Sequence, residues 1–204
     1  MSTAREEILK KLSISVHPVP EPPDFEQPVF PPVIFPLEQT FKTQLEAISG
    51  KVFIFPSQSE LFGSLKTQLQ QLQTMNVFCS EPDVTKYLVQ FEIGFNEYEG
   101  VVKNMEVGIT GCEFLVAQTG SVMVSSAQGG GRQMNISAPL HIVIANRDQL
   151  VATLEEAYSK IQLKYTSGLP SQVALVTGPS RTADIEKTLV LGAHGPRELW
   201  VMIA

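Results

Sequence analysis

The sequence predicts an α/β fold with a mostly parallel central sheet, some antiparallel strands and helices on both faces. Three observations predict it. Apolar runs of strand length alternate with amphipathic helical segments over residues 52–88, which is typical of a parallel sheet covered by helices. Apolar runs between residues 107 and 145 follow one another through short connections, which favours antiparallel pairing. A last apolar run at residues 198–203 supplies a further strand.

The N-terminal segment predicts a short amphipathic helix. Thr3 and Glu6 have the spacing of a capping box, in which two residues bond each other's backbone N–H groups at a helix start. Ile8, Leu9 and Leu12 follow on one helical face. Such a helix either lies on its own domain or acts as a docking arm that contacts another subunit.

Prolines separate this helix from the rest of the chain. Eight of them stand between residues 18 and 36, where they block regular structure. We therefore predict an N-terminal amphipathic helix at residues 1–13, a proline-rich linker at 14–36 and one domain at 37–204. A domain of that length can bury a substantial core.

The first half of the domain alternates helix and strand. Phe41, Leu45 and Ile48 recur at helical spacing, and Gly50 is placed to close that helix. The other elements expected in this half are a strand at 52–55, a capped helix at 57–73, a short strand at 76–79 and a short helix at 84–88.

The second half is richer in strands. We expect the apolar run at 172–176 to be a buried strand that leads into a polar loop. The other expected elements are strands at 107–117, 121–126, 140–145 and 198–203, and a helix that opens at 146–149 and carries Leu150, Leu154 and Ala157.

Composition excludes several classes of function. Hydrophobic residues make up 43% and charged residues 18% of the 204-residue chain, as in ordinary globular domains. The net charge of −6, with no basic patch, argues against nucleic-acid binding because a phosphate backbone is repelled on average. The N-terminus lacks a signal-peptide core and no apolar run has membrane-spanning length, so we expect a cytoplasmic protein.

Cys79 and Cys112 are the only cysteines. Both stand in apolar, strand-like sequence, which favours buried free thiols over a disulfide and fits a reducing compartment. Their spacing matches neither a zinc site nor an iron–sulfur ligand set. The three histidines are scattered, without carboxylates at ligand spacing, so we predict no metal site in this chain.

The most polar loop stands at residues 177–186, with the sequence TGPSRTADIE. It follows an apolar strand, where open α/β sheets place their ligand sites. The hydroxyl residues are good helix N-caps, and the planar charge of Arg181 suits a phosphate or a carboxylate. The loop is therefore either an anion site or a capped turn with a surface pair between Arg181 and Asp184. Its ligand-binding candidates are Gly178, Ser180, Arg181 and Thr182.

A histidine follows in the turn LGAHGP at residues 191–196. Glycine and alanine neighbours leave the ring of His194 accessible, and Asp184 and Glu186 stand near enough in sequence to orient it as an acid or base. On this interpretation His194, Asp184 and Glu186 are catalytic candidates. The alternative is an exposed loop histidine without a role.

A carboxylate, Glu113, interrupts an apolar strand and is a further catalytic candidate. A buried carboxylate needs a partner, which Arg132 or Arg181 can supply, and the pairing is either structural or part of a site. The tight turn that follows has hydroxyl side chains and is a candidate wall of a polar pocket. Its ligand-binding candidates are Gln118, Thr119, Gly120 and Ser121.

The glycine run GGGR at residues 129–132 lets the backbone approach a ligand or move as a lid. Gly131 and Arg132 are its ligand-binding candidates. The run is not a phosphate-binding Walker loop, because no Gly-Lys-Ser/Thr follows. His141 lies in an apolar strand and is interpreted as a core histidine rather than a ligand.

Together these blocks resemble the LUD-domain family of lactate-utilization C proteins. The resemblance runs from about residue 108 to the C-terminus, while the N-terminal half matches only in layout. It implies the NagB/RpiA/CoA-transferase-like fold of glucosamine-6-phosphate deaminase, ribose-5-phosphate isomerase and CoA transferases. The blocks that carry it are GCEF at 111–114, AQTGS at 117–121, GR at 131–132, PLH at 139–141, TGPSRTADIE at 177–186 and LGAHGP at 191–196.

The resemblance also implies a function. It implies a subunit without a cofactor of its own in the cytoplasmic oxidation of L-lactate to pyruvate, beside two larger partners that carry iron–sulfur clusters. The ligand would be a small anionic metabolite, with Arg181 or Arg132 as its carboxylate clamp. The alternative is a stand-alone enzyme or binding protein for a phosphorylated or CoA-activated small metabolite. A scaffold without pocket chemistry is a third interpretation.

One position departs from the family pattern. The family usually reads AETG where residues 117–120 read AQTG. This block also resembles, more loosely, the SENG block of CoA transferases, whose glutamate forms a covalent thioester. Gln118 is an amide and does not readily form that intermediate, which disfavours covalent CoA transfer. It can still donate and accept hydrogen bonds.

Overall fold

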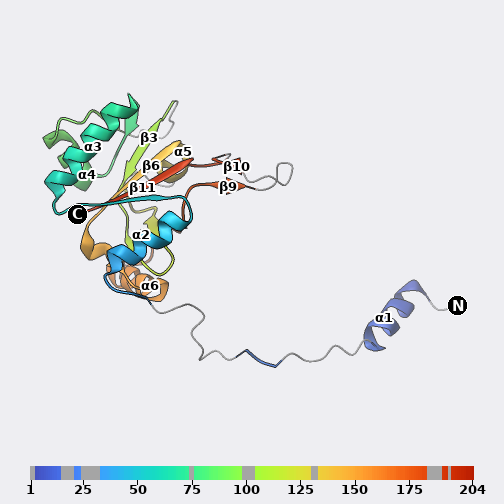
Figure 1. Cartoon of the computed structure of the whole chain (residues 1–204). Coiled ribbons are helices and arrows are strands. Elements are labelled where there is room, and N and C mark those ends of the chain that lie inside the picture. Colours follow the sequence, from blue (N-terminus) through green and yellow to red (C-terminus); the bar gives the residue numbers. More distant parts are fainter. Residues whose placement is uncertain are drawn as a thin grey trace. The chain divides into compact units, whose positions relative to one another are not determined.

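The chain divides into two units, Met1–Pro31 and Pro32–Ala204. The computed structural model describes residues 3–14, 21–23, 33–73, 76–97, 104–129, 133–182, 190–192 and 194–204. The first unit contains helix α1 (Ala4–Ile14; Figure 1). The predicted capping box is confirmed there: the Thr3 N–H donates to Glu6 Oε2 at 2.8 Å, and the Glu6 N–H donates to Thr3 Oγ1 at 3.4 Å.

A five-stranded parallel sheet forms the centre of the second unit, in the order β1–β11–β6–β3–β2 (Figure 1). The middle strand, β6, is buried at all six positions, as expected for a parallel strand covered on both faces. The strands are β1 (Lys51–Ile54), β2 (Val77–Phe78), β3 (Val107–Thr110), β6 (Leu140–Ala145) and β11 (Glu198–Ile203).

Two helices cover one face of this sheet, α3 (Gln58–Leu72) and α4 (Pro82–Gln90). Their apolar side chains, such as Phe62 and Leu88, share one buried cluster with Ile142 of β6. The helix spacing of the apolar residues in both segments explains why one side of each helix lies against the sheet.

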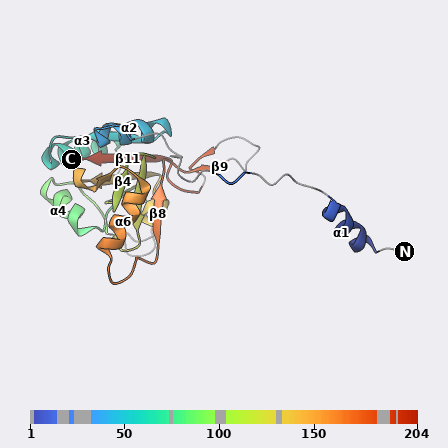
Figure 2. The same ribbon diagram turned by 90° about the horizontal axis from the view of Figure 1, so that it is seen from below.

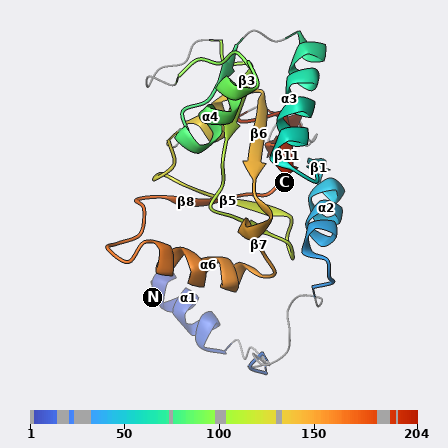
Figure 3. The same cartoon turned by 90° about the vertical axis from the view of Figure 1, so that its left-hand side faces the viewer.

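A second sheet and helix α2 (Leu37–Ala47) cover the other face. This mixed sheet has the order β7–β4–β5–β8, and helix α6 (Leu154–Lys164) packs on its outer side, away from α3 and α4 (Figures 2 and 3). Its strands are β4 (Phe114–Val116), β5 (Ser121–Ser125), β7 (Leu150–Val151) and β8 (Val173–Val176).

The predicted α/β class is confirmed, with the antiparallel pairs placed in the second sheet. Strand β5 pairs antiparallel with both β4 and β8, and β4 pairs parallel with β7. The chain passes from β3 straight into β4, so the strand-rich segment changes sheets instead of extending the parallel one. Strand β8 is an edge strand of the second sheet and only half-buried, so the expectation of a buried strand there was wrong.

The helix predicted to open at residues 146–149 is also corrected. A single 3-10 turn (Arg147–Gln149) is followed by β7, and α6 begins only at Leu154. The Thr153 side chain accepts from the Glu156 N–H at 3.2 Å and so caps α6. Asn146 and Gln149 form a capping box, but it starts only this single 3-10 turn.

Three short elements complete the described fold. They are helix α5 (Met134–Ser137) and the antiparallel pair β9 (Arg181–Thr182) and β10 (Val190–Leu191). None of the helices in the described part of the chain combines the length and the apolar character needed to cross a membrane.

Removal of one helix cap should have a measurable cost. Ser57 is the N-cap of α3, and its hydroxyl accepts from the Glu60 N–H at 3.3 Å. We expect Ser57→Ala to lower the unfolding free energy by about 1 kcal/mol in urea denaturation. The matched control is Ser59→Ala in the exposed first turn of the same helix, where a change within about 0.5 kcal/mol is expected. Equal losses in the two variants would contradict the capping role.

Candidate functional site

A cavity of about 510 Å³ lies at the carboxyl ends of the parallel strands. The segments that follow β2, β3 and β6 contribute Glu81, Glu113 and Asn146 to its wall. Lys164 and Tyr165, at the end of α6, complete it from the second sheet's side. Ligands of open α/β sheets bind at this edge, so the cavity is the candidate functional site.

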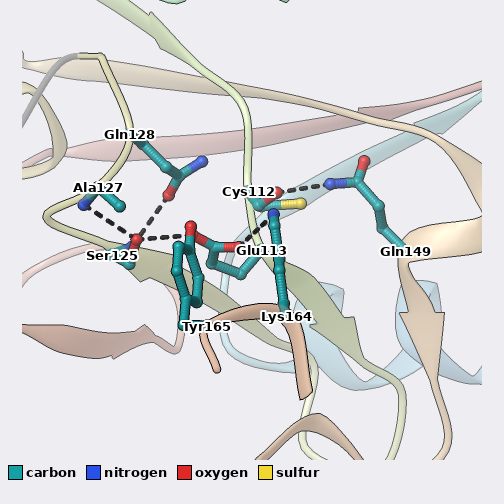
Figure 4. Close-up of polar contacts among 8 residues, drawn as sticks. All are labelled: Cys112, Glu113, Ser125, Ala127, Gln128, Gln149, Lys164 and Tyr165. Atoms are coloured by element: carbon teal, nitrogen blue, oxygen red, sulfur yellow. Dashed lines mark hydrogen bonds and ion pairs between the residues drawn. The ribbon is translucent and has the colours of Figure 1, made fainter. Parts of the chain in front are cut away.

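Glu113 is the most completely bonded group in this cavity. It is 2% exposed, and its Oε1 atom accepts from Ser125 Oγ at 2.6 Å and from the Tyr165 hydroxyl at 2.8 Å (Figure 4). Its Oε2 atom accepts from Lys164 Nζ at 2.7 Å. Burial raises the pKa of Glu113, but these three donors together outweigh burial and hold it below its usual value. Glu113 is therefore an ionised anchor for Lys164 and Tyr165.

Lys164 remains charged in this setting. Burial lowers the pKa of its ammonium group, but the hydrogen bond and charge of Glu113 outweigh that effect and raise it. The Lys164 side chain is 52% exposed, so the ammonium group that bonds Glu113 also faces solvent and the cavity. An ammonium has three N–H donors, and Glu113 occupies one of them.

Glu81 is a second carboxylate in the cavity, and its pKa is raised, whereas that of Glu113 is lowered. It is the N-cap of α4, makes no side-chain capping bond, and lies against the backbone of Gly111, where a Cβ would come within 2.6 Å of Glu81 Oε2. Its Oε1 atom is buried and has no hydrogen-bond partner among the described residues. Burial raises the pKa of Glu81, and the Glu113 charge adds to this, against the lowering by the Gly111 N–H and Gln128.

Two amide side chains bind backbone groups in the cavity wall. Gln149 Nε2 donates to the Cys112 carbonyl at 2.5 Å, and Gln128 Oε1 accepts from the Ser125 N–H at 2.9 Å (Figure 4). Cys112 is a buried free thiol and so is Cys79, as predicted. Burial raises the pKa of the Cys79 thiol to about 12 and that of Cys112 still further, so neither is a ready nucleophile.

The predicted turn of residues 118–121 lies elsewhere, at the opposite end of β4 and β5, and lines none of this cavity. Thr119 Oγ1 and Ser121 Oγ are hydrogen-bonded at 2.7 Å, and Ser121 Oγ and Thr177 Oγ1 at 2.8 Å. Gly120 packs against the backbone of α2, and the Gln118 N–H donates to the Ala152 carbonyl at 3.0 Å. These hydroxyls join β5 to the end of β8.

Arg181 lies near this turn rather than near Glu113. Its guanidinium donates to the Ile48 carbonyl and to Ser49 Oγ (3.0 Å), so it binds the C-terminal end of α2, where a cation is favourable. The expected partner of Glu113 is corrected: Lys164 takes the place proposed for Arg181, and Arg132 lies outside the described residues. An additional role for Arg181 in ligand binding stays a prediction.

The two most polar blocks of the sequence lie side by side. The Ser180 N–H donates to the Pro196 carbonyl at 2.8 Å, and the Gly192 N–H donates to the Ser180 carbonyl at 2.8 Å. Gly178 has a φ of 88°, a backbone conformation that favours glycine, and Thr182 belongs to β9. His194 is exposed in the turn between β10 and β11. Its proposed partners Asp184 and Glu186 lie outside the described residues, as do Gly131 and Arg132.

His141 is buried in β6, and its Nε2 atom is hydrogen-bonded to Thr110 Oγ1 at 2.8 Å. Burial lowers its pKa to about 4, so the ring is neutral at ordinary pH. The interpretation as a core histidine is confirmed.

Sequence reasoning missed Glu81, Lys164 and Tyr165. Glu81 offered only a weak signal, a carboxylate directly before the proline that begins α4. Lys164 and Tyr165 stand 51 and 52 residues from Glu113, in a segment whose pattern indicates only an amphipathic helix. No spacing rule links residues across that distance.

The structure and sequence both have known relatives. The model of the LUD domain matches residues 96–204, which is more than half of the chain, so the chain belongs to the LUD domain family. The fold is similar to the crystal structure of a DUF162 family protein from Deinococcus radiodurans, with a TM-score of 0.60 and 19% identity over 82% of this chain and 95% of that one.

Curated relatives include proteins called "Lactate utilization protein C". The protein from Halalkalibacterium halodurans is 37% identical over 93 residues, which is 45% of this chain and 40% of that protein. The protein from Oceanobacillus iheyensis is 32% identical over 126 residues, 61% of this chain and 53% of that protein. The chain thus spans only about half of the length of these relatives.

Proposed function

We propose that this LUD-domain protein works in the cytoplasmic use of L-lactate, as a subunit of the system that oxidises lactate to pyruvate. The observation that carries this proposal is the match to several relatives called "Lactate utilization protein C", at 32–39% identity. The matched region contains Glu113, Lys164 and Tyr165 of the cavity wall, whereas Glu81 and the first turn of α4 precede it.

The chemistry of the reaction supports a partner that accepts electrons. Oxidation of lactate to pyruvate releases two electrons and two protons, and iron–sulfur clusters are suitable one-electron acceptors. The two cysteines of this chain fall short of the four thiolates that usually hold such a cluster, and both are buried with raised pKa values. We therefore infer that two iron–sulfur partner subunits carry the electrons, while this chain binds the small acid.

Deletion of the gene in its native host tests this role. We expect growth on L-lactate as sole carbon source to be lost and growth on glucose to be unchanged, with restoration by the intact gene. A tagged copy should recover two iron–sulfur proteins from lactate-grown cells. The proposal would be overturned if the deletion strain grew normally on lactate while deletion of a gene for an iron–sulfur partner abolished that growth.

A further inference from the structure

The charges of the cavity are unbalanced. Among its described lining residues, Glu81, Asp83 and Glu113 are carboxylates, and Lys86 and Lys164 are ammonium groups. Asp83 pairs with Lys86 at 3.0 Å, and Glu113 pairs with Lys164 at 2.7 Å. Each pair is neutral as a unit, so Glu81 alone determines the net charge. When Glu81 is ionised the cavity repels an anion, and when it is protonated the cavity is neutral.

Two features of Glu81 favour its protonated form. Its Oε1 atom is buried without a partner among the described residues, and the Glu113 charge lies nearby, although the Gly111 N–H and the Gln128 amide bond the carboxylate and favour its ionised form. A protonated carboxyl group is instead a hydrogen-bond donor. A ligand carboxylate beside it would accept that hydrogen bond, and the two carboxyl groups would share one proton.

The opposite side of the cavity supplies positive charge. Lys164 Nζ is fixed by Glu113 and keeps two N–H donors beyond that bond. The first turn of α4 also lines the cavity with Pro82, Asp83 and Val84, so the positive end of that helix faces the same space. A carboxylate placed between Lys164 and Glu81 would meet an ammonium on one side and a proton donor on the other.

We propose that the cavity binds a small monocarboxylate such as lactate or pyruvate, together with one proton that Glu81 takes from solvent. This rests on the proposed function and deepens it, because it names the ligand class and the protonation state of the site. The ligand is bound as an anion, the added proton lies between its carboxylate and Glu81, and the net charge of the complex equals that of the cavity before binding.

The groups around Glu81 are consistent with this coupling. Cys79 precedes it, Asp83 and Lys86 face it from α4, and Cys112 and Glu113 face it from the segment after β3. Lys164 from α6 and Asp148 from the 3-10 turn lie close enough to Cys112 to affect its pKa. The charges of Glu113 and Asp83 oppose ionisation of Glu81, whereas the Gly111 N–H and Gln128 favour it, and Lys164 is already paired with Glu113.

Calorimetric titration of the full chain with L-lactate and with pyruvate tests the proposal. Titrations in two buffers of different ionisation enthalpy give the number of protons taken up. We expect an uptake above zero and up to one proton per ligand, and an affinity that rises by as much as about tenfold for each unit that the pH falls above the pKa of free Glu81. Binding of both acids without proton uptake would overturn the coupling, and the absence of binding of either acid would overturn the site.

Two substitutions assign the effect to named groups. Glu81→Gln should still bind, because an amide also donates a hydrogen bond, but proton uptake should vanish and the affinity should become independent of pH. Lys164→Met should weaken binding by about tenfold or more, because it removes a charge-assisted hydrogen bond. Glu92→Gln and Lys160→Met are the matched controls, since Glu92 is exposed, Lys160 is partly exposed, both lie outside the cavity wall and both should leave binding unchanged.

The possible negative results can be told apart. Because Glu81→Gln keeps the size of the side chain and removes a partly buried charge, we expect it to fold, so it carries the test even if Lys164→Met proves unstable. Persistent proton uptake in Glu81→Gln would overturn the assignment to Glu81. If the deletion strain grows normally on lactate while purified protein binds the acids with proton uptake, the proposed function fails and the site remains.

Discussion

Replacement of Glu113 by alanine is expected to lower the unfolding free energy by about 2–3 kcal/mol at neutral pH. The change removes the acceptor of three hydrogen bonds and leaves Ser125, Tyr165 and Lys164 without it. Removal of one partner of a fully buried ion pair costs more than this, because the other charge stays buried. Here the Lys164 ammonium is half-exposed and can turn to water, which limits the loss. Thermal denaturation should show a melting temperature lower by about 5–10 °C for a chain of this length.

The loss of stability in Glu113→Ala should become smaller as the pH falls. The Glu113 pKa in the folded protein lies below its usual value of 4.5, so its ionisation stabilises the fold above that pH and the contribution fades as the pH falls through the lowered pKa. The difference between wild type and Glu113→Ala should therefore be largest near neutral pH and shrink below about pH 4.5. A difference that grows on acidification would contradict the hydrogen-bond account.

Glu198→Ala is the matched control for this prediction. Glu198 also accepts from a lysine and from a second side chain, Lys51 at 2.7 Å and Trp200 Nε1 at 2.9 Å, but its side chain is 50% exposed. Exposed pairs of this kind contribute about 0–1 kcal/mol, so the control should lose much less stability. Equal losses in the two variants would mean that burial of Glu113 is unimportant.

Substitution of Gly120 by alanine should destabilise the second unit by about 3 kcal/mol or more. Two costs act together. Gly120 has a φ of 63°, which residues with a Cβ rarely adopt, and its Cβ would lie 2.5 Å from the Leu45 nitrogen. That neighbour is backbone of α2, so the clash can be relieved only by moving the helix away from the turn. Urea denaturation measures the difference directly.

Gly63 provides a control of opposite sign. It lies inside α3, and an added Cβ would meet nothing within 4 Å. We expect Gly63→Ala to stabilise the protein by about 0.5–1 kcal/mol, because alanine restricts the unfolded chain and favours the helix. A stable Gly120→Ala variant, or one no worse than Gly63→Ala, would refute the close packing of the turn on α2.

Local signals in the sequence predicted local structure well. The capping box at Thr3 is formed as expected, Ser57 caps α3 through its hydroxyl, and Phe41 and Leu45 are fully buried on one face of α2. These features depend on residues three or four positions apart, which a pattern can capture. The α/β class follows for the same reason, since it depends on the order of such elements.

Sheet membership could not be predicted in the same way. Strands β3 and β4 are adjacent in sequence but belong to different sheets, and β8 lies at an edge where its apolar side chains are only half-buried. The pairing partner of a strand depends on long-range packing rather than on its own residues. The polar loop of residues 177–186 follows β8, which belongs to the second sheet, so its described residues do not line the cavity at the carboxyl ends of the parallel strands.

The site was predicted in part. Glu113 was chosen correctly as a buried carboxylate in need of a partner, but its partner Lys164 comes from α6, and Arg181 binds the end of α2. Glu81 gained its importance only from burial against Gly111, which no sequence pattern records. The roles of Ser180 and His194 stay predictions, and neither residue lines the cavity.

A crystal structure of the full chain grown with saturating L-lactate tests the central claim most directly. We expect the lactate carboxylate between Lys164 Nζ and the Glu81 carboxyl group, within hydrogen-bond distance of both. Lactate bound instead beside Arg181, Ser180 and His194, or an empty cavity at saturation, would contradict the assignment of this cavity as the binding site.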